Sequence, residues 1–518
     1  MGERYILSID CGTQSIRALL FDEYGDMAAK EKAEFEPYFS DYPGWAEQEP
    51  EMYYSSLCRV CSGLKEKQPG KWDKIIGVTV TTQRDTCVNI DKDGKVLRPA
   101  IIWLDQRMAK CDKPLPALDN AMFKCIGMRK AVEISRRKSR SNWIKENQPE
   151  IWNATYKYML LSGYLTYRLT GEMKDSIANQ IGHIPFDYKN KSWPKYANSW
   201  RWHVFGIEKE KLPELVEPGQ IIGAIAAAAS AETGLKEGLP IIAGGSDKGC
   251  ETLGSGCLDL DCASLSFGTT ATIQTTSSFY FEPIRFMPAY PSAIPGHYNP
   301  EIEIFRGYWM ISWFKKEFST RELLEAKERN IPPEVLLNER LNDIPPGSHG
   351  LILQPYWGPG LKMPDAKGSI IGFGDVHTRA HIYRAIIEGI NYALYEGLEL
   401  IERKSGTRVR RIMVSGGGSQ SDTICQITAD MFNRPVCKGV TYETSGLGAA
   451  IIGFVGLGIY GSYREAVDKM VRSSVIYQPD KNGAEIYSKL YNRVYKKIYS
   501  KLRDLYSEIK EITNYPEI

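Results

Sequence analysis

Apolar and polar residues follow two different patterns along this chain. Short apolar runs between glycine or polar turns indicate strands, and longer stretches with apolar residues every three or four positions indicate helices. Because the two kinds alternate over most of the chain, the pattern predicts an α/β fold. The predicted strands are residues 5–9, 17–22, 75–81, 86–90, 241–243, 263–266, 273–275 and 411–415, and the predicted helices are residues 51–67, 160–169, 383–403, 423–432, 447–457 and 483–509.

The last predicted helix, residues 483–509, has one apolar stripe. Ile486, Leu490, Val494, Ile498 and Leu502 recur every four residues. This spacing places them on one helix face. We therefore expect a C-terminal helix that covers the body of the protein.

An internal repeat indicates that the chain has two related halves. An apolar strand, a Gly-Thr turn and a second strand occur at residues 7–15 and return at residues 264–271. Such a turn presents backbone N–H groups and a hydroxyl, which are the donors that a phosphate needs. Either hairpin alone could be an ordinary glycine turn, but two copies predict two domains that face each other across a cleft. The matched pairs are Asp10 with Ser266, Gly12 with Gly268 and Thr13 with Thr269.

A third glycine cluster, Gly416-Gly417-Gly418, follows the predicted strand 411–415 and precedes the helix 423–432. Strand, glycine turn and helix N-terminus form the place where open α/β sheets hold nucleotides. The alternative is a merely flexible turn. The cluster lacks the GxGxxG spacing, and the sequence has no GxxxxGK[ST] motif, so Rossmann and Walker-A sites are disfavoured.

Polar side chains at the ends of predicted strands supply candidate chemistry. Asp247 follows an apolar strand within a glycine turn, where it could accept the proton of a substrate hydroxyl during phosphoryl transfer. It could equally be an ordinary turn or N-cap aspartate. Gln83, Arg84 and Asp85, and further on Trp103 and Asp105, offer acids, bases and amides suited to a polyhydroxylated molecule. The alternative for these two segments is surface turns with salt bridges.

Composition narrows the class of protein. The 518 residues point to two or three domains, and 43% hydrophobic with 25% charged residues is typical of a globular chain. With 65 basic and 63 acidic residues, the net charge of +2 gives no electrostatic case for a nucleic-acid partner. The longest apolar stretches are shorter than a membrane span, and the N-terminus lacks the apolar core of a signal peptide. Eleven scattered cysteines fit reduced thiols, so we expect a cytoplasmic enzyme without a membrane partner.

In chain order, these motifs resemble those of the FGGY carbohydrate kinases, the family that includes glycerol kinase, xylulokinase, ribulokinase and gluconokinase. The resemblance covers most of the chain, from Tyr5 to Tyr460. Each motif is degenerate, but the ordered set is specific. The motifs are DCGTQSIR at residues 10–17, GWAEQEP at 44–50, GGSD at 244–247, SFGTT at 266–270, RAIIEG at 384–389, GGGSQS at 416–421 and GLGAA at 446–450.

The resemblance implies two actin-like domains of the ribonuclease-H type with an interdomain cleft. It implies a division into residues 1–251, residues 252–460 and a C-terminal helical extension, 461–518, packed on the second domain. It also implies ATP and Mg²⁺ as cofactors, with Asp247 as general base and Asp10 and Asp247 at the metal. The residues implied to hold the nucleotide are Gly12, Thr13, Ser15, Arg17, Gly268, Thr269, Thr270, Gly416, Gly417, Gly418 and Ser421, and those implied to bind the acceptor are Gln83, Arg84, Asp85, Trp103, Asp105 and Asp247.

The acceptor is a small sugar or polyol whose identity the sequence leaves open. Residues 83–86 resemble a glycerol-kinase segment, with Asp85 where that group has glutamate. However, Ser135 falls near a substrate-contacting tyrosine of glycerol kinase, and the Met-His pair typical of xylulokinases is absent. The basic run 136–140 is interpreted as a solvated helix face. Alternatives are glycerol kinase or xylulokinase specifically, or a catalytically inactive actin-like ATP-binding sensor. The sequence leaves the oligomeric state open, with a homodimer as one option.

Overall fold

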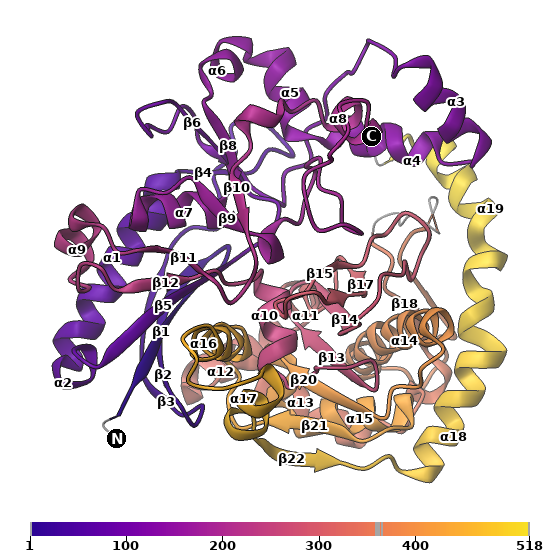
Figure 1. Ribbon diagram of the computed structural model, residues 1–518. Coiled ribbons are helices and arrows are strands. Elements are labelled where there is room, and N and C mark those ends of the chain that lie inside the picture. Colours follow the sequence, from indigo (N-terminus) through magenta and orange to yellow (C-terminus); the bar gives the residue numbers. More distant parts are fainter. Residues whose placement is uncertain (1–2, 358–362, 364–365, 516–518) are drawn as a thin grey trace.

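The computed structural model describes residues 3–357, 363 and 366–515, and it shows two α/β domains built around two six-stranded sheets (Figure 1). In the first sheet the strand order is β11-β12-β5-β1-β2-β3, and in the second it is β17-β14-β13-β20-β21-β22. Both sheets mix parallel and antiparallel neighbours, which confirms the predicted fold class. The strands of the first sheet are β1 (Tyr5–Cys11), β2 (Ser15–Asp22), β3 (Met27–Glu34), β5 (Ile75–Thr82), β11 (Ile221–Ala224) and β12 (Pro240–Ile242). Those of the second are β13 (Cys262–Phe267), β14 (Ala271–Thr275), β17 (Glu301–Ile304), β20 (Arg411–Ser415), β21 (Val436–Gly439) and β22 (Ser473–Tyr477).

The predicted repeat is confirmed at the centre of the two sheets. β1 pairs antiparallel with β2 and parallel with β5, and β13 pairs antiparallel with β14 and parallel with β20. The central strands β1 and β13 are buried along their whole lengths. Two equivalent hairpins therefore leave equivalent positions in the two sheets.

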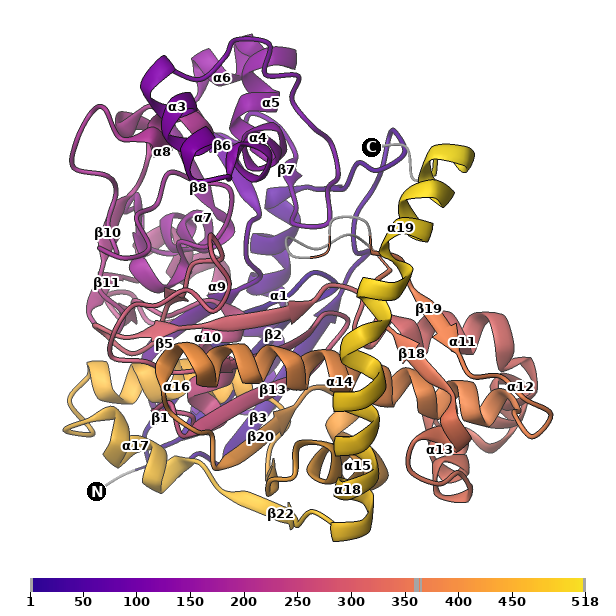
Figure 2. The same cartoon turned by 90° about the vertical axis from the view of Figure 1, so that its right-hand side faces the viewer.

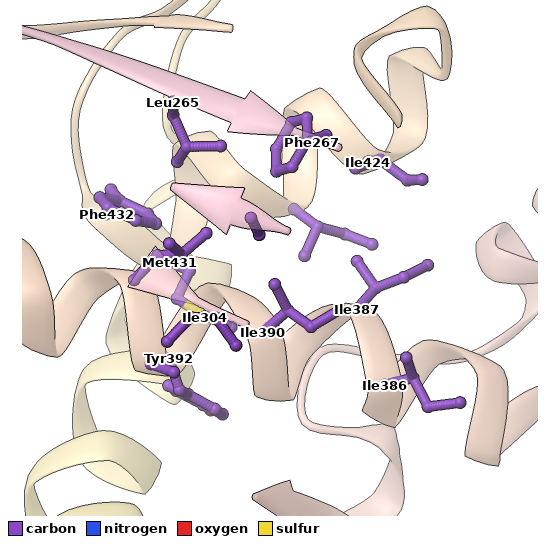
Figure 3. Close-up of a cluster of buried hydrophobic side chains, with 14 of the residues drawn as sticks. Leu265, Phe267, Ile304, Ile386, Ile387, Ile390, Tyr392, Ile424, Met431 and Phe432 are labelled. Carbon is purple, nitrogen blue, oxygen red and sulfur yellow. The ribbon is translucent and has the colours of Figure 1, made fainter. Parts of the chain in front are cut away.

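Helices bury the apolar faces of both sheets. In the second domain, side chains of β13, α14 (Arg379–Ser405) and α15 (Asp422–Phe432) meet in one core, as Figure 3 shows for Leu265, Ile387 and Phe432. In the first domain, α1 (Pro50–Lys67) and α7 (Leu161–Thr170) pack against the sheet. Two further helices of the first domain are α2 (Pro69–Trp72) and α9 (Ala227–Thr233). After β13 the chain forms four more helices, which are α11 (Trp309–Phe318), α12 (Thr320–Arg329), α13 (Pro333–Glu339) and α17 (Tyr463–Met470).

Two helices, α10 (Asp247–Gly254) and α16 (Thr444–Gly456), join the domains (Figure 1). Their backbones approach so closely that a Cβ atom on Gly448 would lie 1.9 Å from the carbonyl oxygen of Cys250. α16 lies in the chain between β21 and β22 of the second sheet, yet it packs on β1 of the first. The sequence predicts only a glycine turn around Asp247; the structure shows that this turn runs directly into α10.

A smaller layer of the first domain lies above its main sheet (Figure 1). A four-stranded sheet in the order β4-β7-β6-β8 forms its base, and short helices surround it. Trp103, Lys138 and Arg140 belong to this layer: Trp103 follows β7, Lys138 ends α4 and Arg140 begins α5. Its elements are β4 (Glu47–Gln48), β6 (Cys87–Ile90), β7 (Ala100–Ile101), β8 (Lys157–Leu160), α3 (Ala117–Cys125), α4 (Arg129–Lys138), α5 (Arg140–Asn147), α6 (Pro149–Ala154) and α8 (Trp200–Phe205). Further short strands are β9 (Lys174–Ser176), β10 (Glu214–Val216), β15 (Tyr290–Pro291), β16 (Tyr298–Asn299), β18 (Ile352–Gln354) and β19 (Ser369–Ile371).

The C-terminal segment packs along the second domain (Figure 1), and most of the predicted apolar stripe faces that domain: Ile498 is buried, and Leu490, Val494 and Leu502 pack, partly buried, against its core. α18 (Lys481–Leu490) and α19 (Lys496–Thr513) are joined by a π-helical turn, Tyr491–Tyr495. Ile486, the first residue of the predicted stripe, is 41% exposed, and three tyrosines that the prediction did not include are buried. They are Tyr487, Tyr491 and Tyr495. Within the described part of the chain, no helix is both long and apolar enough to cross a membrane.

Candidate active site

The predicted general base, Asp247, is the first residue of α10. The helix begins there because the Ser246 hydroxyl caps it by accepting a hydrogen bond from the amide of Gly249. Asp247 Oδ1 accepts a hydrogen bond of 2.8 Å from the amide of Lys248 and lies 3.8 Å from Arg84 Nε. About a third of the side chain, 31%, remains exposed. Burial raises the pKa of Asp247, although Arg84 and Lys248 oppose the rise. A carboxylate with a raised pKa is a better proton acceptor than an ordinary aspartate.

Asp10 lies near the end of β1 and is buried. Its Oδ2 is 3.0 Å from Arg17 Nη1, and Arg17 also contacts Glu443 of α16 at 3.3 Å. Burial raises the pKa of Asp10 to about 6; Arg17 lowers it, and the charges of Asp247 and Glu443 raise it further. Asp10 and Asp247 are therefore carboxylates whose repulsion a cation would relieve.

These two carboxylates fit the way in which proteins hold Mg²⁺. Among the described residues, no three His, Cys, Asp or Glu side chains are arranged to bind a metal by themselves. Mg²⁺, however, is usually held by one or two carboxylates together with water and substrate phosphates. Asp10 and Asp247 can supply the protein's share of such a site.

The two hairpins differ in how open they are. In the first, the amide of Gly12 donates to the carbonyl of Ser15, and the Thr13 hydroxyl is already engaged. It donates to Gln83 Oε1 at 2.7 Å and accepts from Trp103 Nε1 at 2.9 Å. In the second hairpin Thr269 is exposed, and Thr270 donates to the carbonyl of Phe305. The predicted phosphate role of Thr13 thus depends on its backbone, since its hydroxyl contacts acceptor-side residues.

The glycine cluster at the end of β20 forms a tight loop. Gly416 has a φ of +80°, and a Cβ on Gly418 would lie 2.3 Å from the ring of Tyr308, so both positions require glycine. A Cβ on Gly417 would contact nothing within 4 Å. Ser421 caps α15 by accepting a hydrogen bond from the amide of Ile424, so its hydroxyl already has a structural use. The open face at Gly417 is the part of this loop that a nucleotide can approach.

Arg84 connects the two domains at the acceptor side. Its Nη1 donates to both carboxylate oxygens of Glu301 in β17, at 2.9 and 3.0 Å, and its Nε donates to Ser246 at 3.2 Å. Burial works against the charged form, but Glu301 and then Asp247 leave the pKa of Arg84 raised. Arg84 Nη2 is buried without a hydrogen-bond partner among the described residues. A buried donor without a partner beside the predicted general base is suited to a polar ligand.

Asp85 is bound on all sides by protein groups. Its Oδ1 accepts from the amide of His183 at 2.9 Å, and its Oδ2 lies 2.8 Å from both His183 Nδ1 and Arg140 Nη1. Burial favours the neutral acid, yet Arg140 and then His183 lower the pKa of Asp85 to about 2. The interpretation of residues 136–140 as a solvated face is wrong for Arg140, which is buried because it pairs with Asp85.

The remaining predicted acceptor residues divide into two groups. The ring of Trp103 meets that of Phe305 from the second domain, with centroids 5.9 Å apart, so Trp103 lies between the domains. Gln83 is buried and donates to Tyr53 at 2.8 Å. The side chain of Asp105 is 1% exposed, and it binds the amide of Ala46 and the guanidinium of Arg107. Gln83 and Asp105 thus support this region, and their predicted contact with the acceptor stays a prediction.

Several residues of the site carry no local sequence signal. Lys248 Nζ donates to Ser266 of the second hairpin at 2.6 Å and to Glu251 at 2.7 Å. Glu303 lies two residues after Glu301 on the same strand; its side chain is exposed, but desolvation by the surrounding protein atoms and then repulsion by Glu301 raise its pKa to about 7. In the sequence, Lys248 and Glu303 look like ordinary charged residues. The pairing of β17 with β14 is what brings Glu301 and Glu303 to the site.

A separate cavity of about 180 Å³ lies between the domains. Residues from β2–β3, α10, β20 and α16 line it, including Met27, Ser255, Met413 and Leu447. None of the predicted site residues is among its lining residues. The chemistry described above is therefore not located in this cavity.

Comparisons with known proteins point to one protein family over most of the chain. Residues 5–254 match the model of the N-terminal domain, and residues 263–457 that of the C-terminal domain, of the FGGY family of carbohydrate kinases. An uncharacterized sugar kinase of Escherichia coli, YgcE, is 30% identical over 95% of this chain and 92% of its own. A gluconokinase of Bacillus subtilis is 27% identical over 94% of each chain. The crystal structure of a ligand-bound xylulose kinase from Lactobacillus acidophilus has a TM-score of 0.82 at 23% identity, covering 98% of this chain and 99% of that one.

Proposed function

This chain belongs to the FGGY family of carbohydrate kinases and is an ATP-dependent sugar kinase, and from that premise we propose that Asp247 is its general base. The observation that carries the proposal is the position of Asp247. It begins α10 with a raised pKa, lies 3.8 Å from Arg84, and is still partly exposed. These properties suit a carboxylate that takes a proton from a substrate hydroxyl.

In this mechanism, the acceptor hydroxyl gives up its proton to Asp247 as its oxygen bonds to the γ-phosphorus of ATP, while the bond from that phosphorus to the β–γ bridging oxygen breaks and ADP leaves. Asp10 and Asp247 would hold Mg²⁺, which would neutralise part of the phosphate charge. Lys248 brings a positive charge to the second hairpin, where it contacts Ser266. A phosphate can approach the backbone at Gly12 and Gly268 because neither residue carries a side chain, although the amide of Gly12 itself is bonded to the carbonyl of Ser15. Trp103 and Phe305, which meet between the domains, help to exclude water that would otherwise compete for the phosphoryl group.

The acceptor we propose is a small sugar or polyol gripped near Arg84. The buried, unpartnered Nη2 of Arg84 supports this placement. Glycerol or xylulose as the specific acceptor is not favoured, because residues 83–86 and Ser135 match neither group fully. An inactive sensor is not favoured either, because Asp247, Arg84 and Asp10 form a complete site with the chemistry of transfer.

A substrate panel tests this function. We would incubate the enzyme with Mg²⁺-ATP and polyols, ketoses, aldoses and sugar acids, measure ADP formation, and identify the phosphorylated product by mass spectrometry. We expect one acceptor class to raise ADP formation well above the rate with water, with one phosphate added per ADP. ADP formation that no acceptor stimulates would contradict the proposal.

We also propose the domain division at residues 1–251, 252–460 and 461–518, and the cytoplasm as the site of action. All eleven cysteines are free in the structure, which supports a reducing compartment. The first boundary falls within α10 (Asp247–Gly254), the helix that precedes β13, and the third segment contributes β22 to the second sheet.

A homodimer is our proposal for the assembly. The last turns of α19 extend beyond the second domain (Figure 2), and Leu505, Ile509 and Ile512 on this segment are 53%, 45% and 82% exposed. Their spacing places them on one face, which a second copy can cover. Analytical ultracentrifugation of Ile509→Glu, with Lys510→Glu as the control, tests it: the first substitution should give monomers. Wild-type protein that sediments as a monomer would contradict the proposal.

A further inference from the structure

Two free thiols meet where the helix that joins the domains leads into the second sheet. The sulfur atoms of Cys257 and Cys262 lie 2.9 Å apart, and both side chains are buried. Cys257 follows α10, the helix that begins with Asp247, and Cys262 is the first residue of β13, the strand that leads into the second hairpin. Two thiols in direct contact can be joined by oxidation with little movement of the chain, because disulfide formation depends on the two sulfurs being within reach of each other.

The short segment that separates the two cysteines lies at the surface. Asp259 and Asp261 in this segment are exposed. Met413 packs with the two thiols in one cluster, and the same residue lines the cavity of about 180 Å³ between the domains. A cavity of this size has room for a few water-sized molecules. A small oxidant can therefore come near the two sulfurs although both are buried.

The surroundings give the two thiols different reactivity. A hydrogen bond from Cys257 and the positive charge of Arg411, the first residue of β20, lower the pKa of Cys262, although burial opposes them. Burial holds the pKa of Cys257 well above its usual value, and it also raises the pKa of Cys437, the third thiol of this cluster. Because the thiolate is the nucleophile in thiol oxidation, Cys262 is the sulfur that reacts first. Cys257, in contact with it, is the sulfur that closes the disulfide.

We propose that Cys257 and Cys262 form a pair that a hydroperoxide oxidises reversibly to a disulfide. The Cys262 thiolate attacks one oxygen of hydrogen peroxide, the O–O bond breaks, and a sulfenic acid forms. The other oxygen leaves as hydroxide and becomes water by taking up the proton that Cys262 had lost. The Cys257 sulfur then attacks the sulfenic sulfur, the S–O bond breaks, and the hydroxyl leaves as water with the Cys257 proton. Two thiols are thus oxidised to one disulfide, and one peroxide is reduced to two waters.

The pair protects this part of the protein from irreversible damage. A sulfenic acid that has no thiol beside it is oxidised further to a sulfinic acid, which thiol reductants do not reverse. With Cys257 in contact, the sulfenic acid of Cys262 is instead trapped as a disulfide, which they do reverse. The bond would also tie the end of the helix that carries Asp247 to the start of the strand that carries Ser266. This role is independent of the identity of the acceptor.

Peptide mapping of the full-length enzyme tests the proposal. We would treat the wild-type protein with hydrogen peroxide, block the remaining thiols with iodoacetamide in denaturant, and locate each oxidised cysteine by mass spectrometry. We expect a disulfide between Cys257 and Cys262 that dithiothreitol reverses. Cys257→Ala should lack this bond and should accumulate at least about tenfold more sulfinic acid at Cys262 than the wild type. Cys262→Ala should leave Cys257 as a free thiol, and Cys437→Ala, in the same cluster, is the matched control that should keep the disulfide.

The exposed Cys125 reports whether the oxidant has acted on the protein. If Cys125 is oxidised while Cys257 and Cys262 both stay free thiols, the proposal is overturned. A disulfide that contains Cys437 in place of either partner, or equal amounts of sulfinic acid at Cys262 in the wild type and in Cys257→Ala, also overturns it. Thermal unfolding checks that each variant is folded. If neither Cys257→Ala nor Cys262→Ala folds, the maps of the wild type and of Cys437→Ala still decide.

Discussion

Arg84 and Asp85 are neighbours in the chain, but their surroundings give them different roles. Arg84 keeps one buried donor without a partner beside Asp247. Both oxygens of Asp85 are held by Arg140 and His183. The first can grip a substrate directly, whereas the second chiefly fixes the position of Arg140.

Substitutions at these two positions should therefore have different effects: one on the binding of the acceptor, the other on the stability of the fold. Arg84→Lys keeps the charge but loses the planar set of donors, so the acceptor KM should rise about tenfold, while the unfolding temperature stays close to that of wild type. Asp85→Ala leaves Arg140 buried without its counter-charge and should cost about 3–5 kcal/mol of stability. Thermal unfolding and steady-state kinetics check both. An Asp85→Ala enzyme of full stability with only a raised acceptor KM would show that Asp85 acts on the substrate instead.

The raised pKa of Glu303 predicts that the activity of the enzyme falls as the pH rises above about 7. Its pKa is raised to about 7 by desolvation from the surrounding protein atoms and by Glu301, while Arg84 and Lys248 lower it; the side chain is nevertheless exposed. Below that pH Glu303 is neutral, and above it a negative charge appears near Asp247, where the phosphoryl group is transferred. We expect kcat/KM of the wild-type enzyme to fall about two- to fivefold between pH 6 and 8 for this reason.

Glu303→Gln should remove this alkaline fall. It should keep the loss of activity on the acid side, because Asp247 must be ionised to act as a base and its pKa is raised. Comparison of the two pH profiles decides the matter. An unchanged alkaline limb in Glu303→Gln would exclude Glu303 as its source.

The sequence shows the chemistry of single residues better than their partners. Asp247, Arg84 and Asp10 lie at strand ends in recognisable motifs, and the structure brings them together. Their partners Glu301 and Arg140 come from other strands and helices, and neither has a motif of its own. Contacts of this kind depend on strand pairing and helix placement, which local patterns do not contain.

At the scale of elements, the two glycine hairpins are the parts that the sequence shows most clearly, because the strands on both sides of each turn are apolar and buried. The helix α10 could not be predicted in the same way. Its eight residues include glycine at both Gly249 and Gly254, and glycine is a weak helix former. Gly254 is needed because a Cβ there would lie 2.0 Å from the carbonyl oxygen of Thr444 in α16. Packing between helices thus overrides local propensity.

The hairpins give a prediction about nucleotide binding. A Cβ at Gly12 would come no closer than 3.5 Å to any neighbour, so Gly12→Val should fold normally. The valine would occupy the space that a phosphate needs, and ATP affinity should fall at least about tenfold. Calorimetry and thermal unfolding measure the two quantities, with Gly70→Val, which also has open space around it, as the control. Unchanged ATP binding would show that this turn does not hold phosphate.

At the scale of the whole molecule, the site exists only where the two domains meet. Arg84 of the first domain is held by Glu301 of the second, Arg17 by Glu443, and Trp103 meets Phe305. The sequence predicts two facing domains from its repeat, and the structure confirms them. It could not predict that α16 would cross to cover the first sheet, since that helix is apolar nearly all round and shows no preferred partner.

The contact between the domains at Arg84 yields a further prediction. In Glu301→Gln, Arg84 loses its main counter-charge and pairs more strongly with Asp247, which lowers the pKa of Asp247. The acid limb of the kcat profile should move to lower pH, and kcat should fall about tenfold because the base is weaker. Glu325→Gln, on the exposed helix α12, is the control. A profile identical to wild type would mean that Glu301 does not tune the base.

The most direct test of the whole account is the turnover of Asp247→Asn with the acceptor found in the panel, followed by ³¹P NMR of the phosphorylated product. Asparagine keeps the size of the side chain but cannot take the proton, so kcat should fall by about 10²- to 10⁴-fold while ATP affinity stays within about threefold of wild type. Asp93→Asn, in an exposed turn, should behave like the wild-type enzyme. Turnover by Asp247→Asn close to that of wild type would contradict the account, because the proton would then have to leave by another route.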